Sequence, residues 1–124
     1  MNILVIEDDK VALKTLQSAL TNLGHTVSAA GSGEEAIKLI ESSKFDLILT
    51  DVMMPGISGL SLVNVLRSVN LLKIPIIMMS VLHNKPLLDA AFSAGANDFI
   101  EKPVKIEVLK EKLEKYEKQL NPAL

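Results

Sequence analysis

The chain has 124 residues and lacks several residue types, each of whose absence excludes a class of function. It contains no cysteine, which rules out disulfide frameworks, thiolate metal sites and cysteine nucleophiles. With no tryptophan, one tyrosine and three phenylalanines, it offers few platforms on which single-stranded nucleic acids stack. Arg67 is the only arginine and the formal charge is -2, so we expect no direct nucleic-acid partner.

Long apolar runs are missing too. No stretch approaches the roughly 20 residues of a membrane span, and the amino terminus has no basic signal-peptide start. Even so, 48% of the residues are hydrophobic, enough for a core of Leu, Ile, Val, Ala and Met. We therefore expect a single cytoplasmic domain over residues 1–124, without a membrane partner.

Two periodicities alternate along the chain. Continuous apolar runs, typical of strands covered on both faces, occur at residues 3–6, 47–49 and 74–79, and weaker runs at residues 26–30 and 99–100. Between them apolar residues recur at helical spacing, in segments that Ser32 and Asn84 are predicted to cap and Gly24 and Gly95 to end. Five strands alternating with five helices through short connections predict a doubly wound α/β sandwich.

Polar side chains follow four of the five apolar runs, at the strand ends where ligands bind in such sheets. They are Glu7, Asp8, Asp9, Asp51, Ser80 and Lys102. Carboxylates brought this close repel one another unless a cation lies among them, and oxygen ligands favour Mg²⁺. A lysine and a hydroxyl suit the charge and hydrogen bonds of a phosphoryl group. The residues alone therefore indicate a Mg²⁺-dependent phosphoryl site with a carboxylate acceptor.

The order and spacing of these motifs resemble a known family. The motifs are Ile6-Glu7-Asp8-Asp9, Asp51-Val-Met-Met-Pro55-Gly-Ile-Ser-Gly59, Ser80 and Glu101-Lys102-Pro103. The sequence resembles the receiver domain of two-component response regulators over essentially its whole length. The resemblance implies a flavodoxin-like parallel sheet in the order 2-1-3-4-5 with five helices. It also implies a phosphoacceptor, not an enzyme, which a sensor histidine kinase or phosphotransfer protein phosphorylates.

The resemblance assigns roles to the acidic residues. Asp51 is the implied phosphoacceptor and also a ligand of Mg²⁺. Asp8 would bind the ion directly and Glu7 through water, while Met53 would contribute its backbone carbonyl. The same resemblance implies that Ser80 and Lys102 contact the phosphoryl group.

The family pattern also implies a switch and an output surface. Ser80 would move toward the phosphoryl group and Phe99 would fill the vacated space. The Lys102–Pro103 peptide is expected to be cis. A downstream protein would bind the face made by the fourth helix, fifth strand and fifth helix, and a phosphorylation-linked homodimer is a further expectation. Because the chain begins at Met1, a stand-alone regulator is favoured.

One departure from the family pattern keeps an alternative open. Val81 follows Ser80 where the family has Ala or Gly, and its branched side chain would crowd the phosphoryl group. A receiver-like adaptor that works without phosphorylation is therefore a second hypothesis. An aspartyl-nucleophile phosphatase of the haloacid dehalogenase type is a third, although Glu7-Asp8-Asp9-Lys10 does not reproduce its Asp-x-Asp loop.

Overall fold

A computed structural model describes residues 1–123 and contains a sheet of five parallel strands in the order β2-β1-β3-β4-β5. The strands are β1 Asn2–Ile6, β2 Thr26–Ala30, β3 Leu47–Asp51, β4 Ile76–Ser80 and β5 Asp98–Glu101. The helices are α1 Lys10–Asn22, α2 Gly33–Ser42, α3 Gly59–Ser68, α4 Lys85–Ala94 and α5 Ile106–Leu120. The predicted fold class, strand order and alternation of elements are confirmed.

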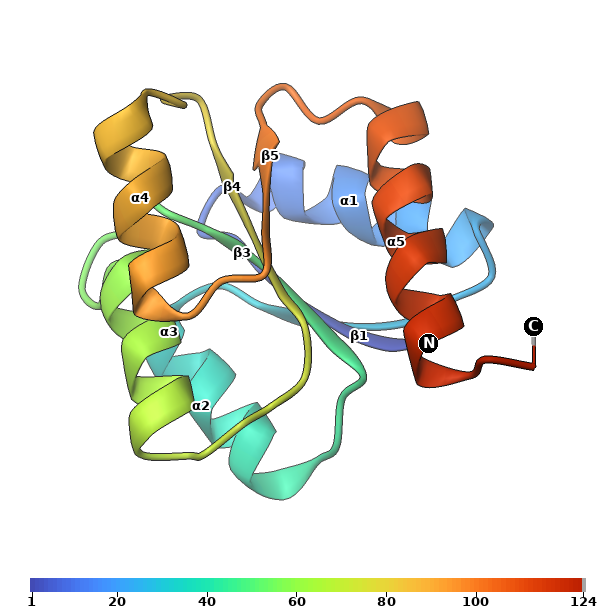
Figure 1. Cartoon of the computed structure of the whole chain (residues 1–124), viewed down its shortest axis with the longest axis horizontal. Helices are drawn as coiled ribbons and strands as arrows, with labels where there is room; N and C mark the ends of the chain where they lie inside the picture. The colour runs from blue at the N-terminus through green and yellow to red at the C-terminus, as the bar shows by residue number, and fades with distance from the viewer. Residues whose placement is uncertain (124) are drawn as a thin grey trace.

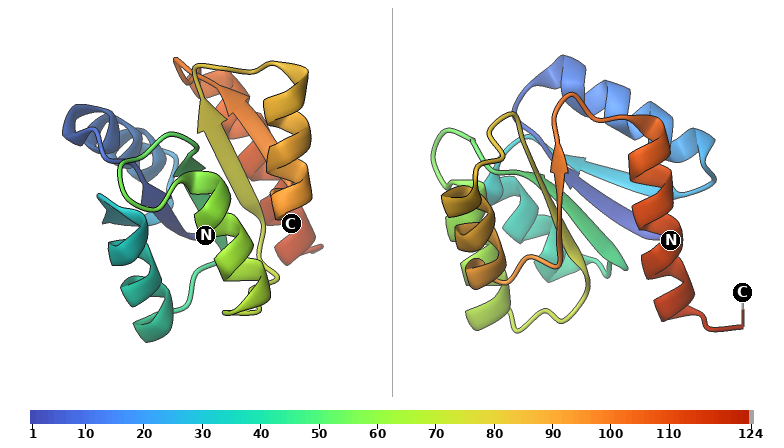
Figure 2. Two further views of the ribbon diagram at one scale, coloured as in Figure 1. Left: turned by 90° about the vertical axis from the view of Figure 1, so that its left-hand side faces the viewer. Right: turned by 45° about the horizontal axis from the view of Figure 1, so that its top comes forward.

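Helices cover both faces of the sheet. In Figures 1 and 2, α1 and α5 lie on one face and α2, α3 and α4 on the other. Successive side chains of a strand point to opposite faces, so Ile3 and Val5 pack with α1 and α5, whereas Leu4 and Ile6 pack on the other side. The three inner strands β1, β3 and β4 are buried on both faces, which explains why their runs in the sequence are continuous, whereas the edge strands β2 and β5 are more exposed.

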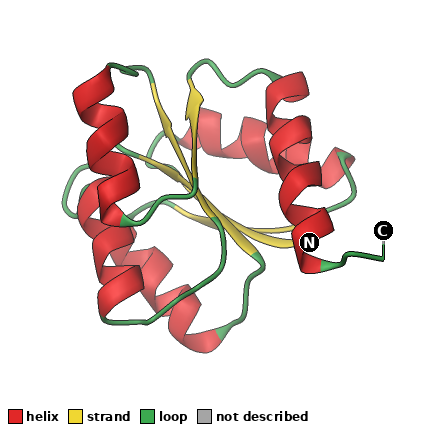
Figure 3. Cartoon of the chain, in the orientation of Figure 1, coloured by secondary structure: helices red, strands yellow, loops and turns green. Residues whose placement is uncertain are grey.

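Figure 3 shows the helices, strands and loops, and the ends of several of these elements follow from local chemistry. The side chains of Ser32 and Asn84 cap α2 and α4 as predicted, by accepting hydrogen bonds from backbone amides of the first turn. The fourth strand begins at Ile76, two residues later than predicted, because Pro75 has no amide hydrogen for the ladder.

The middle of the last helix, α5, packs against the sheet. Leu109, Leu113 and Tyr116 are buried there, whereas Ile106 and Leu120 at its two ends are exposed. The apolar spacing of this helix therefore serves mainly the core, with a free apolar side chain at each end. No helix within residues 1–123 is long and apolar enough to cross a membrane.

Candidate functional site

The buried polar side chains gather at the carboxyl edge of the sheet. Within residues 1–123 they are Glu7, Thr50, Asp51 and Ser80. Glu7 follows β1, Thr50 and Asp51 end β3 and Ser80 ends β4, and the parallel register brings these strand ends side by side. Because burying polar groups costs free energy unless they are paired, their concentration at one edge indicates a site kept for function.

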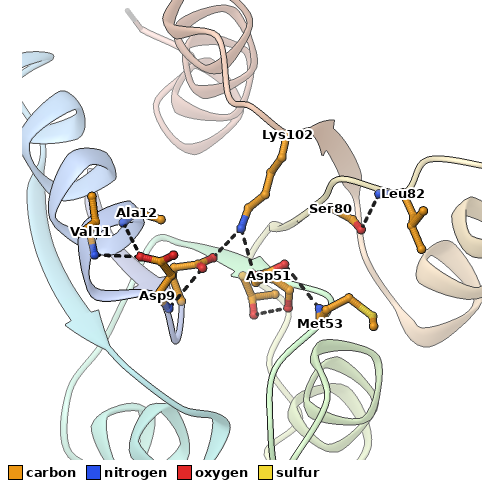
Figure 4. A network of polar contacts seen from close by, with 10 residues as sticks. Asp9, Val11, Ala12, Asp51, Met53, Ser80, Leu82 and Lys102 are labelled. Carbon is orange, nitrogen blue, oxygen red and sulfur yellow. Dashed lines mark hydrogen bonds and ion pairs between the residues drawn. The ribbon is translucent and has the colours of Figure 1, made fainter.

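Lys102 joins two of these carboxylates. It follows β5, where its backbone amide donates to the carbonyl oxygen of Ser80 at 2.9 Å. Its ammonium reaches back across the edge and donates to Glu7 Oε2 at 2.8 Å. The same ammonium donates to Asp51 Oδ2 at 2.9 Å (Figure 4). One cation thus offsets the repulsion between two buried anions. The sequence predicted Lys102 at the site but did not predict its bond to Glu7.

The surroundings of Glu7 at this edge shift the pKa of its carboxyl group toward neutral pH. Burial raises the pKa of Glu7 to about 7, with the neighbouring Asp51 adding to the shift and the bond to Lys102 opposing it. Burial alone lowers the pKa of Lys102, but its bonds to Glu7 and Asp51 outweigh this effect, and the pKa is raised. The ammonium therefore stays charged, whereas Glu7 takes up a proton readily in the metal-free site.

Three carboxylates converge at this edge. Glu7, Asp8 and Asp51 each offer one oxygen, and these oxygens all lie within 4.8 Å of one another. Asp8 is exposed, so its oxygens are open to solvent and to an ion. An all-oxygen donor set of few protein ligands fits the preference of Mg²⁺, which keeps several waters. The residues predicted to hold the ion are therefore together.

Asp9 and Met53 flank these carboxylates in different ways. The carboxylate of Asp9 turns away and caps α1, accepting from the amides of Val11 and Ala12 at 2.9 and 3.1 Å (Figure 4). The amide of Met53 donates to Asp51 Oδ1 at 3.4 Å, which brings the Met53 backbone to the site. Asp9 is thus a structural residue, and the backbone of Met53 lies next to Asp51.

The two predicted switch residues lie on neighbouring strands. Ser80 is 1% exposed, and its hydroxyl accepts from the amide of Leu82 at 3.1 Å (Figure 4). Phe99 is partly buried against the core between the sheet and the α2–α4 layer. Val81, by contrast, is 68% exposed. The Lys102–Pro103 peptide is cis, as predicted.

Gly59 supports the site in a way that the sequence analysis did not identify. This first residue of α3 donates its amide to the carbonyl oxygen of Val52 at 2.8 Å. A Cβ atom at this position would overlap the carbonyl oxygen of Asp51 and approach Val52 Cα to 2.8 Å. Only glycine therefore lets α3 pack directly behind Asp51. Its fixed distance after Asp51 in the quoted motif was the available signal.

Comparisons with known proteins agree with this geometry. The family model of the response regulator receiver domain matches residues 3–114. The chemotaxis protein CheY of Pseudomonas aeruginosa is 33% identical over 123 residues, which cover 98% of this chain and 99% of that protein. The transcriptional regulatory protein AfsQ1 of Streptomyces coelicolor is 36% identical over 108 residues, or 87% of this chain but only 47% of AfsQ1.

Solved structures show the same fold. A two-component response regulator from Clostridium difficile superposes with a TM-score of 0.92 at 29% identity, covering 98% of both chains. The receiver domain of a Francisella response regulator superposes with a TM-score of 0.90 at 29% identity, covering 97% of this chain and 98% of the other.

These matches define a class of phosphoacceptor signalling domains built on a parallel sheet with an acidic carboxyl edge. The chain belongs to the response regulator receiver domain family. Membership favours the phosphoacceptor prediction over both the adaptor and the phosphatase. The chain spans nearly the whole length of that CheY protein and about half the length of AfsQ1.

Proposed function

We propose that residues 1–124 act as one receiver unit in which Asp51 accepts a phosphoryl group from a phosphohistidine of a sensor histidine kinase or phosphotransfer protein. An oxygen of the Asp51 carboxylate attacks phosphorus, the phosphorus–nitrogen bond breaks, and the imidazole leaves with the electron pair. The chain is then itself the phosphorylated product. The convergence of Asp51 with Lys102 and two further carboxylates carries this proposal.

The acidic residues fit a Mg²⁺ site. We assign Asp8, Asp51 and the backbone carbonyl of Met53 as direct ligands and Glu7 as a ligand through water. When bound, Mg²⁺ neutralises charge on the phosphoryl oxygens. Asp8 suits direct contact because its carboxylate is exposed, while Glu7 is buried and already bonded to Lys102.

Lys102 and Ser80 would bind the phosphoryl oxygens. The ammonium of Lys102 lies 2.9 Å from Asp51 Oδ2, so a phosphoryl group on Asp51 would fall within its reach. Ser80 would release the amide of Leu82 and donate its hydroxyl to the new group. That movement frees the loop between β4 and α4 and lets Phe99 turn inward, which alters the α4–β5–α5 face. A downstream protein or a second copy of the chain would bind this face.

Acetyl phosphate with Mg²⁺, followed by mass measurement, tests the acceptor. The wild-type chain is expected to gain one phosphoryl group, and Asp51→Asn is expected to gain none. Asp89→Asn on the exposed side of α4 is the matched control and keeps the adduct. An adduct on both wild type and Asp51→Asn, or on neither, would contradict the proposal, and the second result would favour the adaptor.

A further inference from the structure

Thr50 is the one buried polar side chain, within residues 1–123, to which the proposed reaction assigns no part. It is 0% exposed and precedes Asp51 in β3, where the other residues before the acceptor are all apolar. In the sheet it lies between Ile6 of β1 and Met78 of β4, both of which are fully buried in the core on the α2–α4 side. A hydroxyl in apolar surroundings costs free energy unless it is paired, and a valine would fill the same space without that cost. The presence of a threonine therefore indicates a hydrogen-bonding role.

The partner of Thr50 is the peptide that joins the phosphoacceptor to the next residue. The hydroxyl of Thr50 donates to the backbone carbonyl oxygen of Asp51 at 3.1 Å. The amide of the same peptide, that of Val52, donates to the carbonyl oxygen of Met79 at 3.0 Å. Hydrogen bonds on both polar atoms fix the plane of this peptide, and with it the backbone torsion ψ of Asp51. The main chain of the acceptor is thus held by groups that are not part of its carboxylate.

The start of α3 supports the same peptide. A Cβ atom at Gly59 would overlap the carbonyl oxygen of Asp51, so this first residue of the helix lies directly against that oxygen. Gly59 also donates its amide to the carbonyl oxygen of Val52 at 2.8 Å. The carbonyl group of Asp51 therefore lies between the Thr50 hydroxyl and the beginning of α3. Of these contacts, the hydroxyl is the one that a side-chain substitution removes without altering the backbone.

The orientation of this peptide affects the surroundings of the Asp51 carboxylate. Its Oδ1 accepts from the amide of Met53 at 3.4 Å, and its Oδ2 accepts from Lys102 at 2.9 Å. Only Val52 separates Asp51 from Met53, so a rotation of the Asp51–Val52 peptide would carry the Met53 amide away from Oδ1, to which its bond is already long. The same rotation would displace the Met53 carbonyl, which we assign to Mg²⁺. One hydrogen bond from Thr50 therefore bears on both the acceptor and a metal ligand.

We propose that Thr50 is a positioning residue for phosphorylation, whose hydroxyl holds the Asp51–Val52 peptide so that the Asp51 carboxylate is oriented for attack on phosphorus. This inference rests on the proposed function. The hydroxyl proton is engaged with the backbone and is not transferred, so Thr50 acts through Asp51. Because attack depends on the orientation of the nucleophile, a small displacement slows the reaction even though Asp51 and Lys102 are intact. A threonine suits this role because its methyl group restricts χ1 and so directs the hydroxyl.

Two substitutions separate the hydroxyl of Thr50 from the space that the side chain fills. Thr50→Val keeps the shape and removes the hydroxyl, whereas Thr50→Ser keeps the hydroxyl and removes the methyl group. The readout is the rate of phosphoryl uptake from acetyl phosphate at saturating Mg²⁺, followed by mass measurement over time. We expect Thr50→Val to be about fivefold slower than wild type, which corresponds to about 1 kcal/mol, the net worth of one hydrogen bond. Thr50→Ser should react at the wild-type rate, and only Thr50→Val should shift the backbone amide signal of Met53.

Ile48→Val is the matched control, because Ile48 is fully buried on the same face of β3 and this change also removes one methyl group. Like Thr50→Ser, it should lower the denaturant midpoint and keep the wild-type rate of phosphorylation.

A wild-type rate in Thr50→Val would overturn the inference. Equal slowing in Thr50→Val and Ile48→Val would also overturn it, since the rate would then follow stability, and so would equal slowing in Thr50→Val and Thr50→Ser. A wild-type chain that gains no phosphoryl group would refute the proposed function, and the inference with it. A phosphorylated wild type together with an unslowed Thr50→Val would refute the inference alone.

Discussion

The two ends of the parallel sheet use the same kinds of side chain for opposite purposes. At the amino end, Arg67 donates four hydrogen bonds and the Asp98–Lys112 pair is only 2.7 Å long. At the carboxyl end, three carboxylates converge, and two of them, Glu7 and Asp51, bond to the ammonium of Lys102. The charged groups of the amino end are paired with groups of the same chain. The carboxyl end keeps an excess of negative charge that a bound cation would neutralise. Stability and function are therefore separated along the strands.

The pKa shifts express this difference. At the amino end, bonds from Lys112 and neighbouring donors outweigh burial and lower the pKa of Asp98. At the carboxyl end, burial and the nearness of Asp51 outweigh Lys102 and raise the pKa of Glu7 to about 7. A carboxylate with a lowered pKa stabilises the fold at neutral pH, whereas one with a raised pKa destabilises it. Functional sites commonly carry such a cost.

Removal of Arg67 should have the largest effect on stability. Arg67→Ala leaves three carbonyl oxygens without this donor and removes one of the two donors to Asn97 Oδ1, which keeps the amide of Ile76. We therefore expect a loss on the order of 3 kcal/mol in the free energy of unfolding. Denaturant unfolding measures it. Phosphorylation of the folded fraction at Asp51 should persist, because the carboxyl end is untouched.

The matched control for Arg67 is Lys38→Ala on the exposed side of α2, which should change stability by less than about 0.5 kcal/mol. Equal losses in the two variants would mean that the amino end is not the stabilising end.

At the carboxyl end, replacement of a buried charged residue should raise the free energy of unfolding instead of lowering it. Glu7 binds its proton more tightly in the folded chain, so its contribution is complete below its ordinary pKa of 4.5 and is lost as the pH rises to about 7. In metal-free buffer we expect Glu7→Gln to be more stable than wild type by about 2 kcal/mol at pH 8. Unfolding curves between pH 4.5 and 8 measure the difference.

Asp98→Asn provides the contrasting pH profile. Because the pKa of Asp98 is lowered, its contribution is present above the unfolded pKa and is lost as the pH falls through the folded one. The variant should therefore be less stable than wild type at pH 7, with the gap closing in acid. Loss of stability in Glu7→Gln at pH 8 would refute the proposed asymmetry.

Addition of Mg²⁺ should have a smaller, stabilising effect. At ten times the dissociation constant, an ion that binds only the folded chain adds about 1.4 kcal/mol. Asp8→Asn should abolish this gain, and in metal-free buffer it should be no less stable than wild type, because Asp8 is exposed and its charge repels Glu7 and Asp51. Thermal unfolding with and without Mg²⁺ checks both statements, and an undiminished gain in Asp8→Asn would place the ion elsewhere.

Much of this arrangement could be predicted from residues near one another in sequence. The continuous apolar runs located the strands, and the polar residues that follow them located the carboxyl edge. Ser32 and Asn84 marked helix starts because capping depends on a few adjacent residues. The strand order came from the family resemblance, since apolar periodicity does not say which strands are neighbours.

Contacts between distant segments could not be predicted in this way. Lys102 and Glu7 are 95 positions apart, and nothing in either motif indicates that they share a hydrogen bond. Arg67 was notable only as the sole arginine, yet it bonds to four groups whose positions depend on the completed fold. Gly59 stood in the quoted motif, but its close approach to Asp51 depends on how α3 packs.

Of these variants, Val81→Ala should produce the smallest change in stability. It also tests the hypothesis that the chain is an adaptor that works without phosphorylation. Val81 is 68% exposed, so its truncation should alter stability by less than about 0.5 kcal/mol. It follows Ser80 at the rim of the site, where a smaller side chain gives a phosphodonor more room. We expect phosphorylation by acetyl phosphate to become about twofold to threefold faster, which corresponds to well under 1.4 kcal/mol in the barrier.

Leu82→Ala is the matched variant, because Leu82 is also exposed but uses its backbone amide at the site. A faster rate in Val81→Ala alone would assign the crowding to the branched side chain next to Ser80. If wild type takes up no phosphoryl group and Val81→Ala does, Val81 blocks the acceptor and the wild-type chain is the adaptor. Equal phosphorylation rates in wild type, Val81→Ala and Leu82→Ala would mean that the Val81 side chain does not slow the reaction. Val81 would then no longer support the adaptor hypothesis, because it was the one departure from the family pattern that favoured it.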